Sequence, residues 1–227
     1  MSLAGEGAVV IWHDIAPEGL QDFYAWHTQE HMPERVGIPG FARGRRYIAE
    51  HGSPEYFTLY EAISIETLGG QDYLNRLNNP TPWTSRATQH FRNVSRSVQR
   101  VVYSAGPGIG GHLYSIQLET GDPAAFSENM ITKVLAPLST RHGITGVHLC
   151  QTDAAVSAIM TKEKEGRDGS TGIPGWTLMV EGGTADIVDE MRETAFSDAR
   201  LTAAGAAEIN APALYRLEYI RNKTAFA

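Results

Sequence analysis

Cysteine is nearly absent from this sequence, since Cys150 is the single thiol among 227 residues. One thiol excludes an internal disulfide and is typical of a reducing compartment, so we expect a cytoplasmic protein. Long apolar runs are absent too, and none approaches the roughly 18 residues of a membrane-spanning helix. The opening stretch MSLAGEGAVVIW has no basic region before a long apolar core. We therefore expect neither a secretory signal nor a membrane partner.

Basic charge is scarce as well. The chain carries 19 Lys and Arg against 26 Asp and Glu, a formal net charge of −7, and it has no basic run. Nucleic-acid binding proteins usually cluster their Lys and Arg, so we expect no nucleic-acid partner. A composition of 42% hydrophobic and 20% charged residues is ordinary for a globular protein. The length suits one large domain or two of roughly 100 residues each.

What the sequence does have is an internal repeat. GIPGF at 37–41 resembles GITGV at 143–147, FTL at 57–59 resembles WTL at 176–178, and QRVVY at 99–103 resembles YRLEY at 215–219. The three matches keep their order, with offsets of 106, 119 and 116 residues. Two diverged copies explain this better than coincidence. We place the first repeat at 8–103, a Gly- and Pro-rich linker at 104–111, and the second repeat at 112–221.

Each copy predicts the element order β-α-β-β-α-β. In the first copy the strands are 8–15, 41–50, 56–64 and 97–105, and the helices are 16–35 and 65–79. In the second copy the strands are 112–119, 147–153, 176–182 and 213–220, and the helices begin at Asp122 and Thr184. This order is the ferredoxin-like unit, a four-stranded antiparallel sheet with both helices on one face.

The other face of such a sheet is apolar and must be covered. We therefore predict an α+β fold in which the two tandem repeats pack sheet against sheet within one chain. The space between the sheets is where we expect a small-molecule pocket.

Several residues of the first repeat resemble the EthD-like and stress-responsive barrel group of the dimeric α/β-barrel superfamily. They are Phe23, Trp26, EHMPE at 30–34, GIPGF at 37–41 and RRY at 45–47. The resemblance implies a barrel built from two ferredoxin-like units. That superfamily includes haem-dependent enzymes, cofactor-free monooxygenases, lactone isomerases and polyketide cyclases, so the resemblance implies a small aromatic or apolar substrate. The second repeat lacks the EH-x-P signature.

The end of the first helix carries the candidate chemistry. At 100° per residue one arc of that helix starts apolar and turns polar over its last two turns. Its members are Leu20, Phe23, Tyr24, His27, His31 and Glu34, with Glu30 at the edge. Buried polar groups need partners, so these side chains either bond to one another or face a cavity.

Three interpretations of HTQEH at 27–31 compete. The first is zinc, because H-x-x-E-H could present His27 and His31 to a metal ion. The second is acid/base catalysis, with His31 and His27 moving protons, Glu30 or Glu34 orienting them, and Arg45 or Arg46 stabilising an oxyanion.

The third interpretation is structural. Pro33 removes a backbone donor and ends or kinks the helix, and the polar residues cap the turn that follows. The second repeat places Met130 and Val134 at comparable spacing. Because only the first repeat has the histidines, chemistry is favoured over scaffold.

Further residues are candidate substrate contacts. His13 shares a strand face with Val9 and Ile11 and lines the pocket if that face points between the sheets, whereas Trp12 then lies under the helices. Tyr24 belongs to the polar arc of the helix, and Trp83 follows two prolines near one barrel mouth.

RGRRY at 43–47 places Arg43, Arg45 and Tyr47 on one face and Arg46 on the other. Arg suits planar anions; the alternative is salt bridging to Glu30, Glu34 or Glu50.

The function predicted from the sequence is a small-molecule enzyme that uses acid/base chemistry without a cofactor, as an isomerase, cyclase, lyase or monooxygenase. Its substrate would be a small aromatic or polyketide-like compound, and the protein could form a homo-oligomer. One alternative is a ligand-binding or assembly protein without catalysis. Another is a metal- or haem-dependent enzyme that uses His27 and His31, or for haem His90, His112 or His148.

Overall fold

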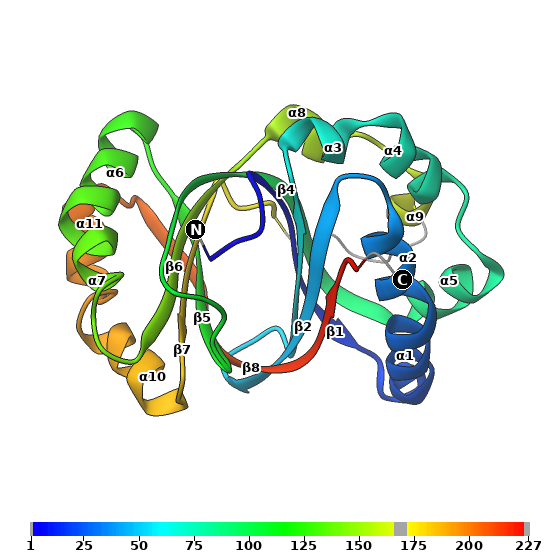
Figure 1. Ribbon diagram of the computed structural model, residues 1–227, viewed down its shortest axis with the longest axis horizontal. Helices are drawn as coiled ribbons and strands as arrows, with labels where there is room; N and C mark the ends of the chain where they lie inside the picture. Colours follow the sequence, from blue (N-terminus) through cyan, green and yellow to red (C-terminus); the bar gives the residue numbers. More distant parts are fainter. Residues whose placement is uncertain (1, 166–171, 225–227) are drawn as a thin grey trace.

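The computed structural model describes residues 2–165 and 172–224, and its centre is a closed barrel of eight strands (Figure 1). The strands are β1 (Gly7–Ile15), β2 (Phe41–His51), β3 (Tyr56–Ala62), β4 (Phe91–Ala105), β5 (His112–Glu119), β6 (Ile144–Thr152), β7 (Trp176–Gly182) and β8 (Glu208–Asn222). All neighbouring strands are antiparallel, in the order β1-β3-β2-β8-β5-β7-β6-β4, with β4 paired to β1.

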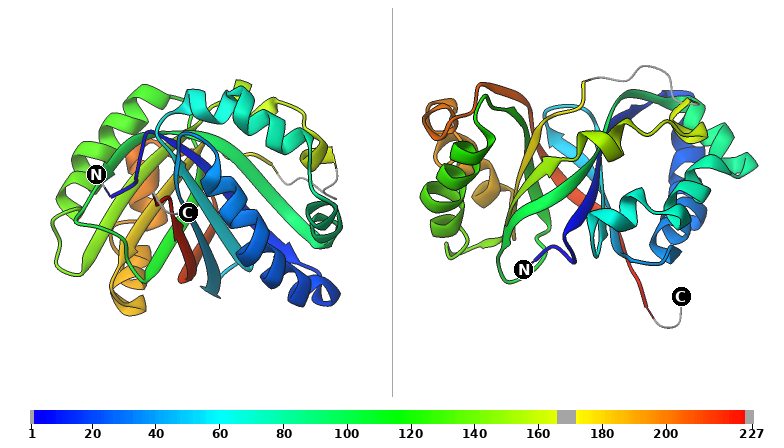
Figure 2. Two further views of the ribbon diagram at one scale, coloured as in Figure 1. Left: turned by 45° about the vertical axis from the view of Figure 1, so that its right-hand side comes forward. Right: turned by 90° about the horizontal axis from the view of Figure 1, so that it is seen from above.

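The barrel divides into two equivalent halves. The first half has the order β4-β1-β3-β2 and the second β8-β5-β7-β6, and pairing of β2 with β8 and of β4 with β6 joins them. The helices cover the outside: those within 17–90 and the two short helices within 154–165 lie at one end of the molecule, and those within 123–138 and 185–204 lie at the other (Figures 1 and 2). The predicted fold, two tandem ferredoxin-like units that close one barrel, is confirmed.

Helices of the first half follow β1 and β3. They are η1 (Pro17–Gly19), α1 (Leu20–Trp26), η2 (His27–His31), α2 (Met32–Gly37), α3 (Ile65–Gly69), α4 (Gln71–Asn78), α5 (Pro82–Ala87) and η3 (Thr88–His90). The second half has α6 (Pro123–Asn129), η4 (Met130–Leu135), α7 (Ala136–Leu138), α8 (Ala154–Ala158), α9 (Lys162–Glu165), α10 (Ala185–Glu193) and α11 (Asp198–Ala204). No helix in 2–165 or 172–224 is long and apolar enough to cross a bilayer.

Strand register fixes which residues of the two halves are equivalent. Glu61 opposes Ala8 as Glu181 opposes Leu113, so Glu61 corresponds to Glu181. The FTL/WTL match is therefore one residue out of register, and only the Arg100/Arg216 match is in register.

The predicted GIPGF/GITGV match is displaced by three residues. Gly40 and Gly143 both have φ of 83° and precede β2 and β6 at the same place. A positive φ is the backbone conformation that glycine adopts without strain. These two glycines are therefore the equivalent pair, rather than the glycines that the letters align.

Alternation along the strands separates an inner from an outer core. β1 directs Val9, Ile11 and His13 outward under the helices and Val10 and Trp12 into the barrel. This is the reverse of the predicted placement of His13 and Trp12. The interior is packed with the rings of Trp12, Tyr47 and Phe57 and their neighbours, as is usual for eight strands. The expected hollow between the sheets is thus filled by side chains.

Pro33 does not end the first helix, which continues through α2 to Gly37. Because proline has no N–H, the Gln29 carbonyl lacks its usual donor and the helix widens into the π-turn η2, where the Met32 N–H bonds to the His27 carbonyl. The second half repeats this at Pro137, where the Ala136 N–H bonds to the Ile131 carbonyl. The π-turn is scaffold shared by both halves.

The described residues of the segment between β6 and β7 pack onto the first half. The Ser157 hydroxyl bonds to the backbone of Val98. Glu163 is buried and pairs with the buried Arg35 of α2. Residues 166–171 of this segment lie outside the described residues.

Candidate functional site

Four of the predicted residues converge between the first helix and the outer face of the first sheet. They are His13, Tyr24, His27 and His31, and β2, β3 and β8 add Arg46, Tyr56, Tyr60 and Glu218. We call these eight residues the Arg46 cluster. It uses residues of both halves, because β8 of the second half pairs with β2 of the first.

Arg46 is the centre of the cluster and is 4% exposed. Its Nε donates to Glu218 at 3.1 Å, and its Nη1 lies 3.3 Å from His27 Nδ1 and 3.2 Å from the Thr28 hydroxyl. The guanidinium carbon lies 4.7 Å from the ring centroid of Tyr24 and 5.6 Å from that of Tyr219. Aromatic faces attract a cation and keep water away from it, so this charge is held in an aromatic cage.

Glu218 reaches the cage because of a β-bulge. The pairing of β2 with β8 shifts after Arg46, which faces Tyr219, whereas Tyr47 faces Leu217. An extra residue in a strand bends it and redirects a side chain. The Glu218 carboxylate accepts from Arg46 and also from the Tyr24 hydroxyl at 3.1 Å.

Two tyrosine hydroxyls lie beside this carboxylate. Tyr24 Oη and Tyr56 Oη are 3.2 Å apart. Burial raises the pKa of Tyr24 above 10.0, and burial together with the Tyr24 hydrogen bond raises the pKa of Tyr56 further. Both phenols are therefore neutral donors near pH 7.

His27 is a neutral imidazole in one tautomer. Burial, and then the positive charge of Arg46, holds the pKa of His27 well below 6.5. A guanidinium can only donate, so His27 Nδ1 is the acceptor and Nε2 carries the proton, 3.4 Å from the Tyr60 hydroxyl. The lone pair of His27 Nδ1 therefore faces the Arg46 guanidinium.

The other two histidines lie in aromatic surroundings. The His31 ring is 4.2 Å from the Trp26 ring and 5.6 Å from the His27 ring, centroid to centroid. His13 stacks on Tyr56 at 5.4 Å and contacts Phe91 at 4.5 Å. Both imidazoles are buried.

The second half has apolar residues at seven of the eight equivalent positions; the eighth, Tyr24, corresponds to the exposed Glu128. Strand register and the two π-turns give the correspondence. His13, His27, His31, Arg46, Tyr56, Tyr60 and Glu218 correspond to Leu118, Ile131, Leu135, Leu149, Trp176, Val180 and Val102. These second-half residues belong to its apolar core or pack against it. The fold therefore closes this layer without polar groups, and the Arg46 cluster is not required by the scaffold.

The predicted oxyanion residue Arg45 points the other way, into the barrel. Its Nη1 donates to both Glu181 oxygens at 2.9 and 2.8 Å, and its Nε lies 2.9 Å from Glu61. His148 Nε2 is 3.0 Å from Glu181. Burial opposes ionisation of Glu181, but Arg45 and His148 outweigh it and lower its pKa to about 2. The expected partners Glu30, Glu34 and Glu50 are replaced by carboxylates of the barrel interior.

Arg43 and Tyr47 share the barrel face with Arg45. Arg43 donates to Glu61 and to the Ser2 carbonyl. The Tyr47 ring lies in the inner core beside Arg45. These two predicted substrate contacts are thus on the opposite side of the sheet from His27.

Glu30 and Trp83 lie at the outer edge of the first half. The Glu30 carboxylate accepts from the hydroxyls of Thr81 and Thr84 at the start of α5, at 2.6 and 3.3 Å. Trp83 Nε1 donates to Asp22 at 2.9 Å. Both contacts fasten α5 to the first helix, so neither residue reaches the Arg46 cluster.

The metal alternative has little support in this geometry. Both ring nitrogens of His27 are engaged by protein groups, one of them by a cation. Glu30 of the H-x-x-E-H pattern points to α5. Over residues 2–165 and 172–224, no three His, Cys, Asp or Glu side chains are grouped as a metal site.

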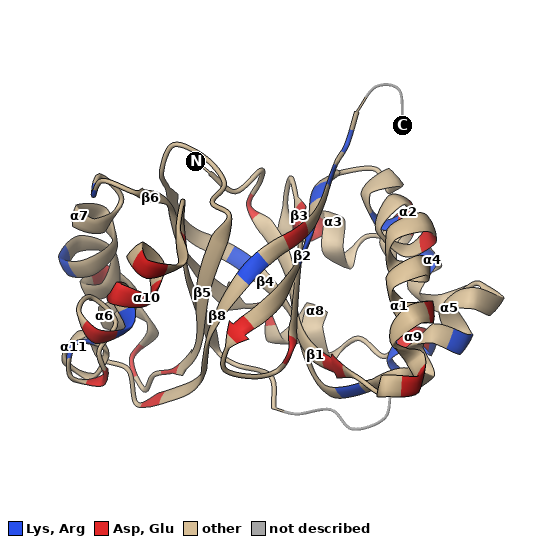
Figure 3. Ribbon diagram, turned by 90° about the horizontal axis from the view of Figure 1, so that it is seen from below, with Lys and Arg blue, Asp and Glu red and all other residues tan. Residues whose placement is uncertain are grey.

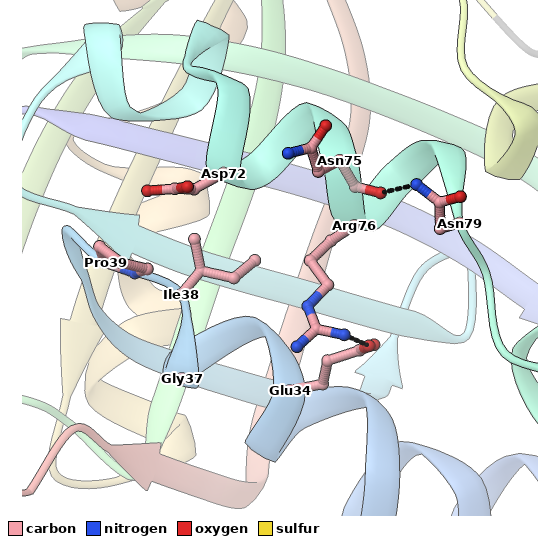
Figure 4. A pocket seen from close by; sticks show the side chains of 8 residues that line it. All are labelled: Glu34, Gly37, Ile38, Pro39, Asp72, Asn75, Arg76 and Asn79. Atoms are coloured by element: carbon pink, nitrogen blue, oxygen red, sulfur yellow. Dashed lines mark hydrogen bonds and ion pairs between the residues drawn. The ribbon is translucent and has the colours of Figure 1, made fainter.

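A polar groove of about 520 Å³ lies on the outer side of α2 (Figure 4). It runs between the end of α2 and α4, and Glu34 on one wall pairs with Arg76 on the other at 3.0 Å. The predicted orienting residue Glu34 thus faces this groove. Figure 3 shows acidic and basic residues interspersed over the helices at both ends, with no continuous basic face in that view.

Sequence reasoning missed Tyr56, Tyr60 and Glu218, and gave Arg46 only as an alternative to Arg45. The signal for Arg46 was its place on the strand face opposite Arg45. Tyr56 and Tyr60 share that outer face of β3 with Thr58. Glu218 had no such signal, because the bulge that redirects it is a property of the paired strands.

Solved structures share this fold at low sequence identity. A protein of Fusobacterium nucleatum described as a provisional monooxygenase has a TM-score of 0.61 and 11% identity over 97% of this chain and 96% of its own. An anthrone oxidase-like protein has a TM-score of 0.62 and 12% identity over 98% and 95%. A provisional monooxygenase of Lactobacillus acidophilus has a TM-score of 0.57 and 8% identity over 96% of both chains. No family model and no curated protein matches this sequence.

These likenesses concern the fold. The chain has the ferredoxin-like, dimeric α/β-barrel fold, with both units of the barrel in one polypeptide. Within that fold it is defined by a polar cluster in the first half and an apolar core in the second.

Proposed function

We propose that the protein is a small-molecule enzyme that performs acid/base chemistry at the Arg46 cluster, without a cofactor, on a small aromatic or polyketide-like compound. The observation that supports this most strongly is the asymmetry between the halves. Polar groups that are buried at a cost, where the same fold uses leucine and valine, are retained for a purpose other than packing.

The chemistry suits a substrate that ionises to a flat, delocalised anion. Arg46 would stabilise the developing charge on oxygen, since a guanidinium in a dry aromatic cage acts in a low dielectric. The hydroxyls of Tyr24 and Tyr56 would donate to the same oxygen. His27 would accept the proton at Nδ1 once Arg46 has turned to the substrate, with the Tyr60 hydroxyl holding its tautomer.

His31 and His13 would be positioning residues that pack around the reacting group, and Glu30 and Arg45 would serve the scaffold. The names of similar structures point to oxidation of anthrone-type compounds and to monooxygenation. Oxidation of an anthrone without a cofactor begins with removal of an acidic proton from its methylene carbon or from a phenol. In the oxidation of an anthrone, one O₂ is consumed, one oxygen atom enters at the C10 methylene carbon, and the other leaves as water.

The test uses dithranol, a commercial dihydroxyanthrone. Under nitrogen in D₂O, the wild type should exchange the C10 protons faster than buffer does, and in air it should speed O₂ uptake. The variants His27→Ile and Arg46→Leu, which install the residues of the second half, should lose both effects. Leu149→Met in the second half is the matched control and should keep them. Catalysis that is equal in all four proteins would contradict the assignment to this cluster.

A further inference from the structure

The position of Glu218 suggests more than a structural ion pair. Its side chain is 16% exposed and lies at the open edge of the cluster, whereas the Arg46 that it neutralises is almost fully buried. One carboxylate oxygen accepts from Arg46 Nε and the other from the Tyr24 hydroxyl. A carboxylate held by a guanidinium and a phenol is itself a bound planar oxyanion.

The second half shows that this carboxylate is optional. Val102 occupies the equivalent bulge between β4 and β6, where Leu149 replaces Arg46. The bulge is therefore a feature of the barrel, and what is particular to the first half is the anionic side chain placed on it. Val102 also shows that an apolar side chain fits at this bulge.

We propose that Glu218 is the specificity-determining residue of the site: its carboxylate occupies the anion position of Arg46 and Tyr24 in the free protein, and a planar organic oxyanion displaces it on binding. This inference rests on the proposed function, since it assumes that Arg46 binds the ligand. The rings of Tyr24 and Tyr219, which contact Arg46 and are partly exposed, would then stack on the ligand plane. The Glu218 side chain is partly exposed and lies on a strand, so it can turn away without unfolding the helix.

Displacement has a thermodynamic consequence. An incoming anion must break the bonds that Glu218 makes before it forms its own, so the apparent affinity is lowered by the strength of this internal competition. The same competition discriminates against neutral ligands, which gain too little from Arg46 to displace a carboxylate.

Calorimetric titration with 2-naphthoate, and with neutral 2-naphthamide as control, tests this. Glu218→Gln keeps the shape and removes the charge, so its Kd for 2-naphthoate should fall by about 10-fold to 100-fold, the equivalent of one charge-assisted hydrogen bond. Glu218→Val, the residue of the second half, should behave likewise and guards against a fold defect in the first variant. Arg46→Leu combined with Glu218→Gln should bind neither compound.

The outcomes separate the two proposals. Equal affinity of wild type and Glu218→Gln, with binding lost in Arg46→Leu, would overturn the role of Glu218 and leave the Arg46 site standing. Weaker binding in both Glu218 variants would show that this residue contacts the ligand instead of competing with it, which also overturns the inference. Binding that does not depend on Arg46 would remove the basis of both proposals.

Discussion

Replacing the Arg46 cluster by its apolar counterparts should leave the protein folded. The triple variant His27→Ile/Arg46→Leu/Glu218→Val carries the residues that the second half has at these positions. Exchanging a buried ion pair for apolar groups is neutral or stabilising by about 1–4 kcal/mol. The gap left by the shorter Leu beside the Tyr24 ring costs about 1–2 kcal/mol. We therefore expect the free energy of unfolding to stay within about 2 kcal/mol of wild type, or ~4–8 °C in Tm.

The single variant Arg46→Leu should be less stable than the triple. It leaves the Glu218 carboxylate and His27 Nδ1 without their cation or donor, and breaking a buried pair costs about 3–5 kcal/mol. Because the Glu218 side chain keeps 16% exposure, we place the loss near ~3 kcal/mol. Urea unfolding followed by tryptophan fluorescence and by circular dichroism gives both values. A triple variant that is less stable than the single would refute the reasoning, because it would mean that the cluster holds the fold together.

Two further predictions concern pH and the barrel interior. The pKa of His27 is lower in the folded protein than in the unfolded chain. As pH falls below 6.5, the unfolded state therefore takes up a proton first. The free energy of unfolding should drop by up to ~1.4 kcal/mol per pH unit in this range. His27→Ile should lack that drop. The pKa of Glu181 falls from 4.5 to about 2, so its contribution should be complete above pH 4.5 and lost on titration towards pH 2. Arg45→Met should lower the free energy of unfolding by about 3–5 kcal/mol, because it leaves two buried carboxylates without this cation. Thermal melts over a range of pH measure the contributions of His27, Glu181 and Arg45. An Arg45→Met variant that melts at the wild-type temperature would contradict the buried network.

Much of the fold could be predicted from the sequence because strands, helices and turns each have a local pattern of apolar and polar residues. Apolar strands, polar turns and repeated letters predicted two ferredoxin-like units and their closure, and strand order bears this out. The register between the two repeats was harder to predict. Matching GIPGF to GITGV paired Gly37 with Gly143, although the shared positive φ makes Gly40 the structural counterpart of Gly143. A short sequence match shows similar composition, whereas the structural equivalence of two residues depends on how their strands pair.

The candidate site was predicted only in part, for a related reason. The helical period correctly grouped Tyr24, His27 and His31, because side chains on one helix are placed by the chain itself. The face of β1 was assigned the wrong way round, and Arg45 was grouped with the histidines although it lies on the opposite face of β2, since alternation says that two faces differ without saying which one meets the helices. Arg46 therefore replaces Arg45 as the charged partner.

The central claim is that ionisable groups under the first helix perform chemistry that the second half does not. The most direct measurement compares dithranol turnover by wild type with that of the triple variant His27→Ile/Arg46→Leu/Glu218→Val, after its stability has been verified. We predict a folded triple variant whose C10 proton exchange and O₂ uptake equal those of buffer alone. A folded triple variant that still catalyses both at the wild-type rate would contradict the account.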